Sequence, residues 1–267
     1  MRWKRTAAAG ILACALTVTA TPAATLTVAG EALPPSAHTL LINDRTYVPL
    51  RAVAQGLSPQ ARVEWEDGAA TVTTEALNLT ARVGERWLEA NDRYFYIEDG
   101  VRLIGGSVMV PVRALAAAMG GGVDWDPGAR SVSVRAGTGA PEAPTYSEDD
   151  LYWLARIISA ESQGEPLEGK LAVGTVVLNR VASDEFPDSI YGVIFDREWG
   201  TQFTPVDNGT VYHEPTQESV MAAKMCLDGV RVAGESLYFL DPEKSTNFWT
   251  MENRTYVMTI GCHWFYE

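Results

Sequence analysis

The sequence predicts an α+β protein with two domains, and three features of the chain lead to this prediction. A motif occurs twice in the first half, as Tyr47-Val-Pro-Leu-Arg-Ala-Val-Ala54 and as Met109-Val-Pro-Val-Arg-Ala-Leu-Ala116. A stretch rich in glycine and proline, residues 137–146, follows the second copy and is typical of a linker. Beyond this linker, apolar residues recur at helical spacing. With 267 residues, the chain is long enough for each half to bury a core of its own.

Residues 1–29 are predicted to be a signal peptide. The segment begins with the basic Met1-Arg-Trp-Lys-Arg5, continues with small and apolar residues, and offers cleavage sites between Ala20 and Ala29. The apolar run is too short to cross a bilayer as a mature helix. We therefore expect a secreted protein of the cell envelope that has no membrane span.

Residues 34–136 are predicted to form the first domain. Each copy of the motif predicts a β-hairpin, a helix that opens at Pro49 or Pro111, and a second hairpin, in the order ββαββ. Each copy then reaches a tryptophan between acids, Trp65 or Trp125. We expect these rings to pack in the core or against the hairpin rather than to stack on sugars. Further strands are expected at residues 77–83 and 87–97.

Residues 147–267 are predicted to form the second domain, in which helices precede a small sheet. Ser147, followed three residues later by Asp150, marks the start of the first helix. Gly164 and Pro166 end it. The other expected elements are helices at 167–181 and 215–227, a short helix or extended segment at 186–195, and strands at 236–240 and 256–260.

Glu161, at the end of that first helix, is the candidate catalytic residue. It continues the apolar stripe of Leu154 and Ile158, so the pattern predicts that its side chain points toward the buried face. Desolvation would raise the pKa of such a carboxyl and keep it protonated near neutral pH, as a general acid requires. A solvated glutamate at a helix end is the alternative, and periodicity alone does not exclude it.

The composition excludes several classes of protein. A net charge of −13 leaves no basic patch for nucleic acid or anionic lipid as the main partner. His38, His213 and His263 lie far apart in the sequence, so we expect no metal site and no cofactor, and we expect His263 to be a packed structural residue. Cys226 and Cys262 remain after signal cleavage, and the sequence does not show whether they pair.

The repeated motif of the first domain, together with Val63-Glu-Trp-Glu66 and Val123-Asp-Trp-Asp126, resembles the copper amine oxidase N-terminal stalk domain. The resemblance implies a spacer, a dimerisation module or a module that binds a spore or envelope partner. Despite the family name, these residues offer no cluster of metal ligands. We therefore assign this domain no chemistry.

The second domain carries an ordered series of motifs, at residues 154–166, 169–181, 186–190, 192–194, 202–206, 237–242 and 261–266. With these motifs it resembles the spore-cortex-lytic cell wall hydrolases along essentially its whole length. The resemblance implies a lysozyme-like helical core of the lytic transglycosylase type with a small β-sheet. It also implies that Glu161 is the catalytic acid and that the substrate is a peptidoglycan glycan strand.

A lytic transglycosylase needs only one acid. Hydrolytic glycosidases usually use two carboxylates, and the second candidates here, Glu165, Asp207 and Asp241, lie in turns where we expect a local role. In a transglycosylase, the single acid protonates the oxygen between N-acetylmuramic acid and N-acetylglucosamine. It then accepts the proton of the muramic C6 hydroxyl, which closes a 1,6-anhydro ring without water. The candidate substrate-binding residues are Gln202, Thr204, Tyr238, Asn247 and Trp249.

Two alternatives remain. An N-acetylmuramoyl amidase would need a zinc site or a cysteine–histidine pair, and the adjacent Cys262 and His263 would point to opposite faces of a strand. A non-catalytic envelope protein would bind peptidoglycan through both domains, which the intact motif around Glu161 disfavours. The sequence leaves open the oligomeric state, an activating partner, and whether the substrate is spore cortex or vegetative wall.

Overall fold

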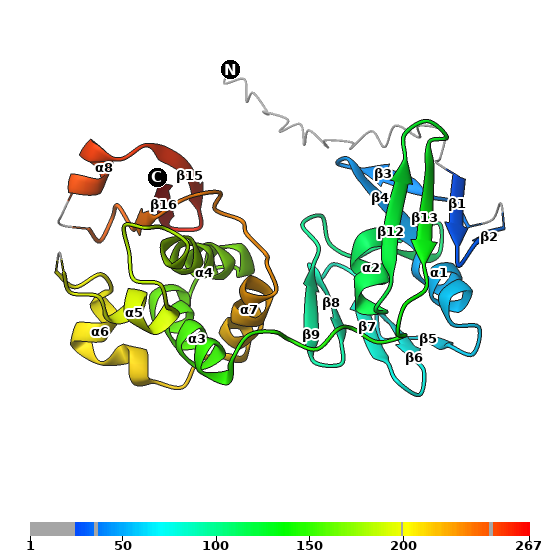
Figure 1. Ribbon diagram of the computed structural model, residues 1–267, viewed down its shortest axis with the longest axis horizontal. Coiled ribbons are helices and arrows are strands. Elements are labelled where there is room, and N and C mark those ends of the chain that lie inside the picture. The colour runs from blue at the N-terminus through cyan, green and yellow to red at the C-terminus, as the bar shows by residue number, and fades with distance from the viewer. Residues whose placement is uncertain (1–24, 35–36, 199, 246–247) are drawn as a thin grey trace, which may run out of the picture.

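The computed structural model describes residues 25–34, 37–198, 200–245 and 248–267, which form two domains joined by a coil (Figure 1). Within these ranges, the N-terminal domain is rich in β-strands and the C-terminal domain is mainly helical with one small sheet. The predicted mixed α+β class is confirmed. Most of the segment expected to be a signal peptide lies outside the described residues.

The two copies of the sequence motif adopt the same local structure. In each copy a strand ends at a proline, Pro49 or Pro111, and a helix begins at the next residue. Each proline is the extended N-cap residue of its helix, where no intrahelical hydrogen bond requires the N–H group that proline lacks. The elements around the first motif are β3 (Leu40–Ile42), β4 (Arg45–Pro49), α1 (Leu50–Leu57), β5 (Arg62–Glu66) and β6 (Ala69–Thr73). Those around the second motif are β10 (Arg102–Ile104), β11 (Ser107–Pro111), α2 (Val112–Ala118), β12 (Gly122–Asp126) and β13 (Ser131–Arg135).

The two copies share one sheet, because β4 and β11 pair antiparallel at its centre in the order β10-β11-β4-β3. A second sheet has the order β5-β6-β7-β8-β9, with β7 at Asn78–Arg82, β8 at Trp87–Ala90 and β9 at Arg93–Tyr96. The expected strand at 87–97 is thus two strands, since Asn91 and Asp92 adopt positive φ and turn the chain between them.

The folded N-terminal domain begins earlier than the sequence pattern predicts. Two strands, β1 (Thr25–Val28) and β2 (Glu31–Ala32), lie ahead of residue 34. They complete a third sheet in the order β12-β13-β1-β2, in which β1 pairs in parallel with β13. The partner strand is more than 100 residues away, so no local pattern indicates this pairing.

The core interpretation of the two tryptophans is wrong. Trp65 and Trp125 are each 48% exposed. Each follows a more buried valine by two residues on the same face of an edge strand, β5 or β12, and lies close to the turn that ends the strand. The core does not extend this far along the strand, so one part of each ring remains open to solvent.

The C-terminal domain is built around three helices, α3 (Glu148–Ser162), α4 (Leu167–Val181) and α7 (Gln217–Leu227), which pack on one another. Nearly every side of α4 is buried, as its apolar sequence predicts. The predicted strands appear as β14 (Tyr238–Leu240) and β15 (Tyr256–Ile260). Elements that we did not specify are α6 (Thr204–Asn208), η1 (Thr210–Tyr212), α8 (Trp249–Asn253) and β16 (His263–Tyr266), whereas the ambiguous segment 186–195 contains α5 (Ile190–Phe195).

The structure shows the surroundings of His263 and of the two cysteines, Cys226 and Cys262. His263 is buried and packs edge-on against the Phe239 ring, with 5.2 Å between ring centroids, so its expected structural role is confirmed. Cys226 is buried, Cys262 is exposed, and both are free thiols. Among the described residues, no helix is both long and apolar enough to span a bilayer.

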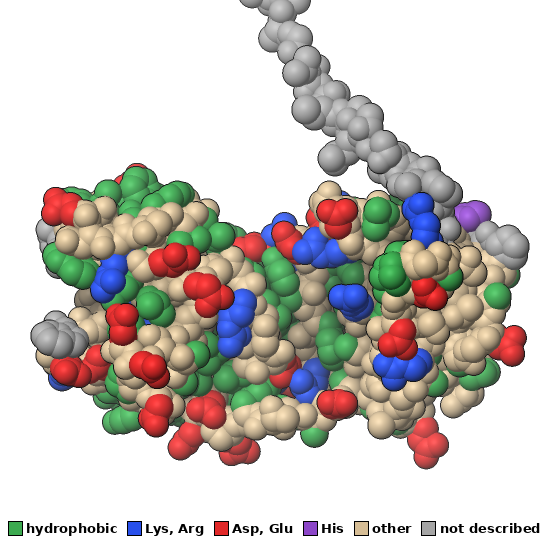
Figure 2. All heavy atoms as spheres, turned by 45° about the horizontal axis from the view of Figure 1, so that its top comes forward, with side chains coloured by type: hydrophobic (Ala, Val, Ile, Leu, Met, Phe, Trp, Pro, Cys, Tyr) green, Lys and Arg blue, Asp and Glu red, His purple; other side chains and the backbone are tan. Residues whose placement is uncertain are grey.

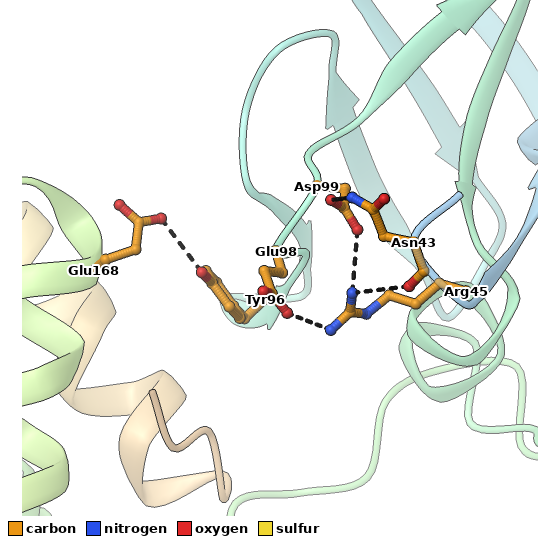
Figure 3. Close-up of polar contacts among 6 residues, drawn as sticks. All are labelled: Asn43, Arg45, Tyr96, Glu98, Asp99 and Glu168. Atoms are coloured by element: carbon orange, nitrogen blue, oxygen red, sulfur yellow. Dashed lines mark hydrogen bonds and ion pairs between the residues drawn. The ribbon is translucent and has the colours of Figure 1, made fainter. Parts of the chain in front are cut away.

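The hairpin of β8 and β9 holds the two domains together. The Arg93 guanidinium donates two hydrogen bonds to the Asp228 carboxylate, at 2.9 and 2.7 Å. The Tyr96 hydroxyl donates to Glu168 of α4 at 3.3 Å, as Figure 3 shows. Aromatic rings of this hairpin also pack against the core of the C-terminal domain. The contact therefore combines apolar packing with charged pairs.

Candidate active site

Helix α3 carries Glu161 to the edge of a cleft. The helix begins with a capping box, in which the Ser147 hydroxyl accepts from the Asp150 amide at 3.0 Å and the Asp150 carboxylate accepts from the Ser147 amide. Leu154, Ile157 and Ile158 are fully buried on its inner face. Glu161 follows in the last turn, and its side chain is half-buried.

Burial raises the pKa of the Glu161 carboxyl to about 7, and the nearby positive charge of Arg180 partly opposes this effect. Within the described residues, no group donates a hydrogen bond to this carboxyl. A protonated form thus persists near neutral pH, and the proton is free to be transferred to a ligand.

The cleft beside Glu161 encloses about 360 Å³. One wall is α3 and the residue that follows it, with Ser159, Glu161 and Gln163. The other wall is α6, η1 and the residues that follow η1, including Thr204 and Glu214. Most of these side chains are polar, which suits a ligand with many hydroxyl and amide groups.

Arg180 is a functional candidate that the sequence analysis did not single out. It lies in the last turn of α4, is 4% exposed, and donates from Nε to the Leu237 carbonyl at 2.7 Å. Its guanidinium lies over the rings of Phe186, Phe203 and Tyr238, at 4.8, 5.2 and 5.5 Å from their centroids. Burial lowers its pKa to about 10, so it stays charged at neutral pH. One signal was available: a charged residue in a helix that is otherwise apolar on nearly every side must find buried partners.

The predicted substrate-binding residues fall into two groups. Thr204 lines the cleft with Glu161. Gln202 and Tyr238 instead surround Arg180, because the Gln202 amide oxygen accepts from Arg180 at 3.4 Å and the Tyr238 ring lies beneath the guanidinium.

Arg254 extends the second group outward. It donates to the Tyr238 hydroxyl at 2.7 Å, and its guanidinium lies 5.2 Å from the centroid of the half-exposed Trp249. Asn247 lies outside the described residues. The roles of all five predicted residues remain predictions.

The three carboxylates considered as a second acid each have a local partner. Glu165 accepts from the Cys262 amide at 3.0 Å and so holds the turn between β15 and β16. Asp207 pairs with Arg197 at 3.0 Å, and Asp241 pairs with Lys244 at 2.8 Å. None of the three lines the cleft.

Glu214 is a second carboxylate in the cleft, which the sequence analysis did not consider. Its side chain is 89% exposed and accepts from the buried Arg156 guanidinium at 2.7 Å. Among the described residues, no group of three or more His, Cys, Asp or Glu side chains could hold a metal ion.

Comparison with known proteins agrees with this architecture. Residues 164–266 match the profile of the Cell Wall Hydrolase family, and residues 27–134 match that of the copper amine oxidase N-terminal domain. The cell wall hydrolase CwlJ of Oceanobacillus iheyensis is 30% identical over 104 residues, which cover 37% of this chain and 72% of that protein. The chain belongs to the cell wall hydrolase family. Glu161 lies three residues before the range that matches the family profile.

Other relatives match only the second half of this chain. The spore cortex-lytic enzyme of Bacillus cereus is 36% identical over 129 residues, and the chain spans about half of its length, at 48%. The catalytic domain of the germination-specific lytic transglycosylase SleB from Bacillus anthracis is 33% identical and aligns over 47% of this chain and 100% of that domain, with a TM-score of 0.43.

Proposed function

We propose that the protein is an exported lytic transglycosylase that cleaves peptidoglycan strands between N-acetylmuramic acid and N-acetylglucosamine. The observation that carries this proposal is Glu161, a carboxyl with its pKa raised to about 7 at the edge of a polar cleft. The names of the relatives, which include spore cortex-lytic enzymes and a lytic transglycosylase, support the same reaction.

Glu161 would act twice in this reaction. As an acid, it gives its proton to the bridging oxygen, and the bond from that oxygen to the muramic C1 breaks. As a base, the resulting carboxylate accepts the proton of the muramic C6 hydroxyl while that oxygen bonds to C1. The products are a free sugar hydroxyl and a 1,6-anhydro end, and Glu161 regains its proton. A pKa near neutrality suits a group that must both give and take a proton.

Thr204, in the same cleft, would hydrogen-bond the reacting sugar. Gln202, Tyr238 and Trp249 would hold neighbouring rings and amides, with Arg180 fixing Gln202 and Tyr238 in place. Asn247 stays a proposed contact by its sequence position. We also propose that residues 147–267 share the lysozyme-like arrangement of lytic transglycosylases, and that the two ββαββ segments of the N-terminal domain are copies of one unit.

The domain limits that follow from this proposal are a stalk domain ahead of the linker at 137–146 and a cell wall hydrolase domain after it. Because Thr25–Val28 is part of a sheet, we place signal cleavage before Thr25. The substrate is peptidoglycan of the spore cortex or the wall, and the protein acts in the envelope or the spore.

A hydrolase is the second candidate, and Glu214 is the observation that favours it. A carboxylate across the cleft from Glu161 could activate water, as in inverting glycosidases. However, Glu214 already pairs with Arg156, and it is almost fully exposed.

Mass analysis of fragments released from purified peptidoglycan separates the candidates. We expect anhydro-muramic ends, and we expect Glu214→Gln to release them as well. Reducing ends that disappear in Glu214→Gln would establish hydrolysis. Freed stem peptides with intact glycan would establish an amidase, and binding without any product would establish a non-catalytic protein.

A further inference from the structure

The internal repeat creates two equivalent grooves in the N-terminal domain. The first contains Trp65 with Pro49, Arg51 and Val63, and encloses about 370 Å³. The second contains Trp125 with Pro111, Arg113 and Val123, and encloses about 800 Å³. Each groove is closed by the hairpin of the other copy, through Leu103 in the first and Leu41 in the second.

The arginine beside the tryptophan differs between the grooves. Arg51 donates to the Val63 carbonyl at 2.8 Å, so its guanidinium is already engaged. Arg113, the equivalent residue, is exposed and has no hydrogen bond or ion pair with any described residue. Arg130, also exposed, lines the same groove and is equally unpaired. The groove at Trp125 therefore presents two free guanidinium groups beside an exposed aromatic ring.

Most other charges in this groove neutralise one another. Arg45 is held by Glu98 and Asp99, as Figure 3 shows, and Arg93 by Asp228. The acidic side chain without such a partner is Asp44. The unpaired charge is therefore positive, in a chain whose net charge is −13.

The groove also opens toward the C-terminal domain, whose residues Asp228 and Val230 form part of its lining. In Figure 2, basic and hydrophobic side chains gather on the N-terminal half where it faces the other domain. A long ligand in the groove would therefore remain alongside the catalytic domain.

We propose that the groove around Trp125 is a second binding site for a glycan strand that carries carboxylates, as peptidoglycan does through its stem peptides. A sugar ring stacks on the exposed face of Trp125, and carboxylates of the same strand pair with Arg113 and Arg130. Guanidinium groups bind carboxylates in a bidentate geometry, and an indole offers a large apolar face with little entropy to lose. The identity of this ligand rests on the proposed function, whereas the site itself does not.

Binding to insoluble peptidoglycan tests this site. The full chain with Glu161→Gln would be sedimented with purified peptidoglycan, so that cleavage does not remove the ligand. Adding Trp125→Ala should weaken binding by about tenfold or more, as loss of a central aromatic contact does. The matched control is Trp65→Ala, which removes an equally exposed tryptophan and should bind as the parent does. Equal binding of the two variants would overturn the proposal.

Two further variants distinguish the loss of the binding site from a loss of the fold. Arg113→Ala combined with Arg130→Ala changes only exposed side chains, and it should weaken binding and reduce its salt dependence. Trp125→Tyr keeps an aromatic face and should recover most of the loss. If Trp125→Ala instead broke up a dimer of the chain without weakening peptidoglycan binding, the groove would be an interface between copies and the proposal would be wrong.

The test of this binding site can fail or succeed independently of the proposed transglycosylase reaction. In a chain that keeps Glu161, release of anhydro ends from short soluble glycans by Trp125→Ala at the wild-type rate, together with the weaker binding to insoluble peptidoglycan, supports both ideas. Binding that depends on Trp125 in a protein that releases no anhydro ends would support the site and contradict the reaction.

Discussion

The two domains differ in what they bury. Among the described residues, the N-terminal domain buries two side chains that carry a hydroxyl group, Thr39 and Tyr47, and its core is otherwise largely aliphatic. The C-terminal domain buries the cations Arg156, Lys170 and Arg180 together with several hydroxyl groups and His263. Burying polar and charged groups costs free energy unless each is paired. Ionisable groups with perturbed pKa values concentrate at functional sites, so the difference is consistent with the proposed function, in which the C-terminal domain carries the reaction.

The largest effect should come from Glu161, a desolvated carboxyl of the C-terminal domain that has no counterpart among the described residues of the N-terminal core. Glu161→Gln removes the transferable proton while keeping shape, so cleavage of peptidoglycan should fall by about 10²–10⁴-fold with the fold retained. Release of glycan fragments measures the loss, and circular dichroism checks the fold. Asp207→Asn, which changes an exposed carboxylate outside the cleft, should stay close to wild type. Substantial activity in Glu161→Gln would place the catalytic acid elsewhere.

The same substitution should stabilise the protein at alkaline pH. The folded protein keeps the Glu161 proton up to about pH 7, whereas an unfolded chain releases it near pH 4.5, so wild-type stability falls as pH rises through this window. Glu161→Gln avoids this loss and should be more stable by about 3 kcal/mol at pH 8. Below pH 4 the two proteins should unfold alike. Urea titrations at both pH values measure the difference, and equal stability at pH 8 would argue against a desolvated carboxyl.

Arg180 should influence both stability and the acid. Arg180→Met leaves the Leu237 carbonyl without its donor, at a cost of about 1–3 kcal/mol. It also removes the positive charge that opposes the raised pKa of Glu161, so the alkaline limb of the activity profile should move to higher pH. Arg180→Lys keeps the charge and should leave that limb nearly in place. If the alkaline limb did not move in Arg180→Met, the charge of Arg180 would not influence the pKa of Glu161.

The smallest effect should come from the contact between the domains. Arg93→Ala removes the bidentate pair with Asp228, in which both side chains are only 16% exposed. We expect a loss of about 1–2 kcal/mol in the free energy of unfolding. Arg62→Ala, which breaks an exposed pair with Glu64 inside one domain, is the control and should cost less than about 0.5 kcal/mol. Equal losses would mean that the two domains are not coupled through this pair.

Local patterns predicted much of the fold and little of the site. The capping box at Ser147 and the apolar stripe that leads to Glu161 both depend on residues of one helix that are close in the sequence, so the sequence alone indicates both. The pairing of β1 with β13 joins distant segments and has no local signature. Likewise, the sequence shows Arg180 as a charged residue in a largely apolar helix but does not show its partners, because Gln202, Leu237 and Tyr238 come from other segments.

The exposure of Trp65 and Trp125 could not be predicted for a related reason. The alternation of each strand assigns both rings to the inner face, and that assignment does not say how far the core extends along the strand. Only the assembled sheets show that the core ends before each ring.

The central claim is that one carboxyl in the cleft holds its proton near neutral pH, and carbon-13 NMR tests it directly. The side-chain carboxyl signal of Glu161, assigned by its absence in Glu161→Gln, would be followed from pH 3 to pH 9. We predict a midpoint of about 7. A midpoint near 4.5, the value of a solvated glutamate, would contradict the account.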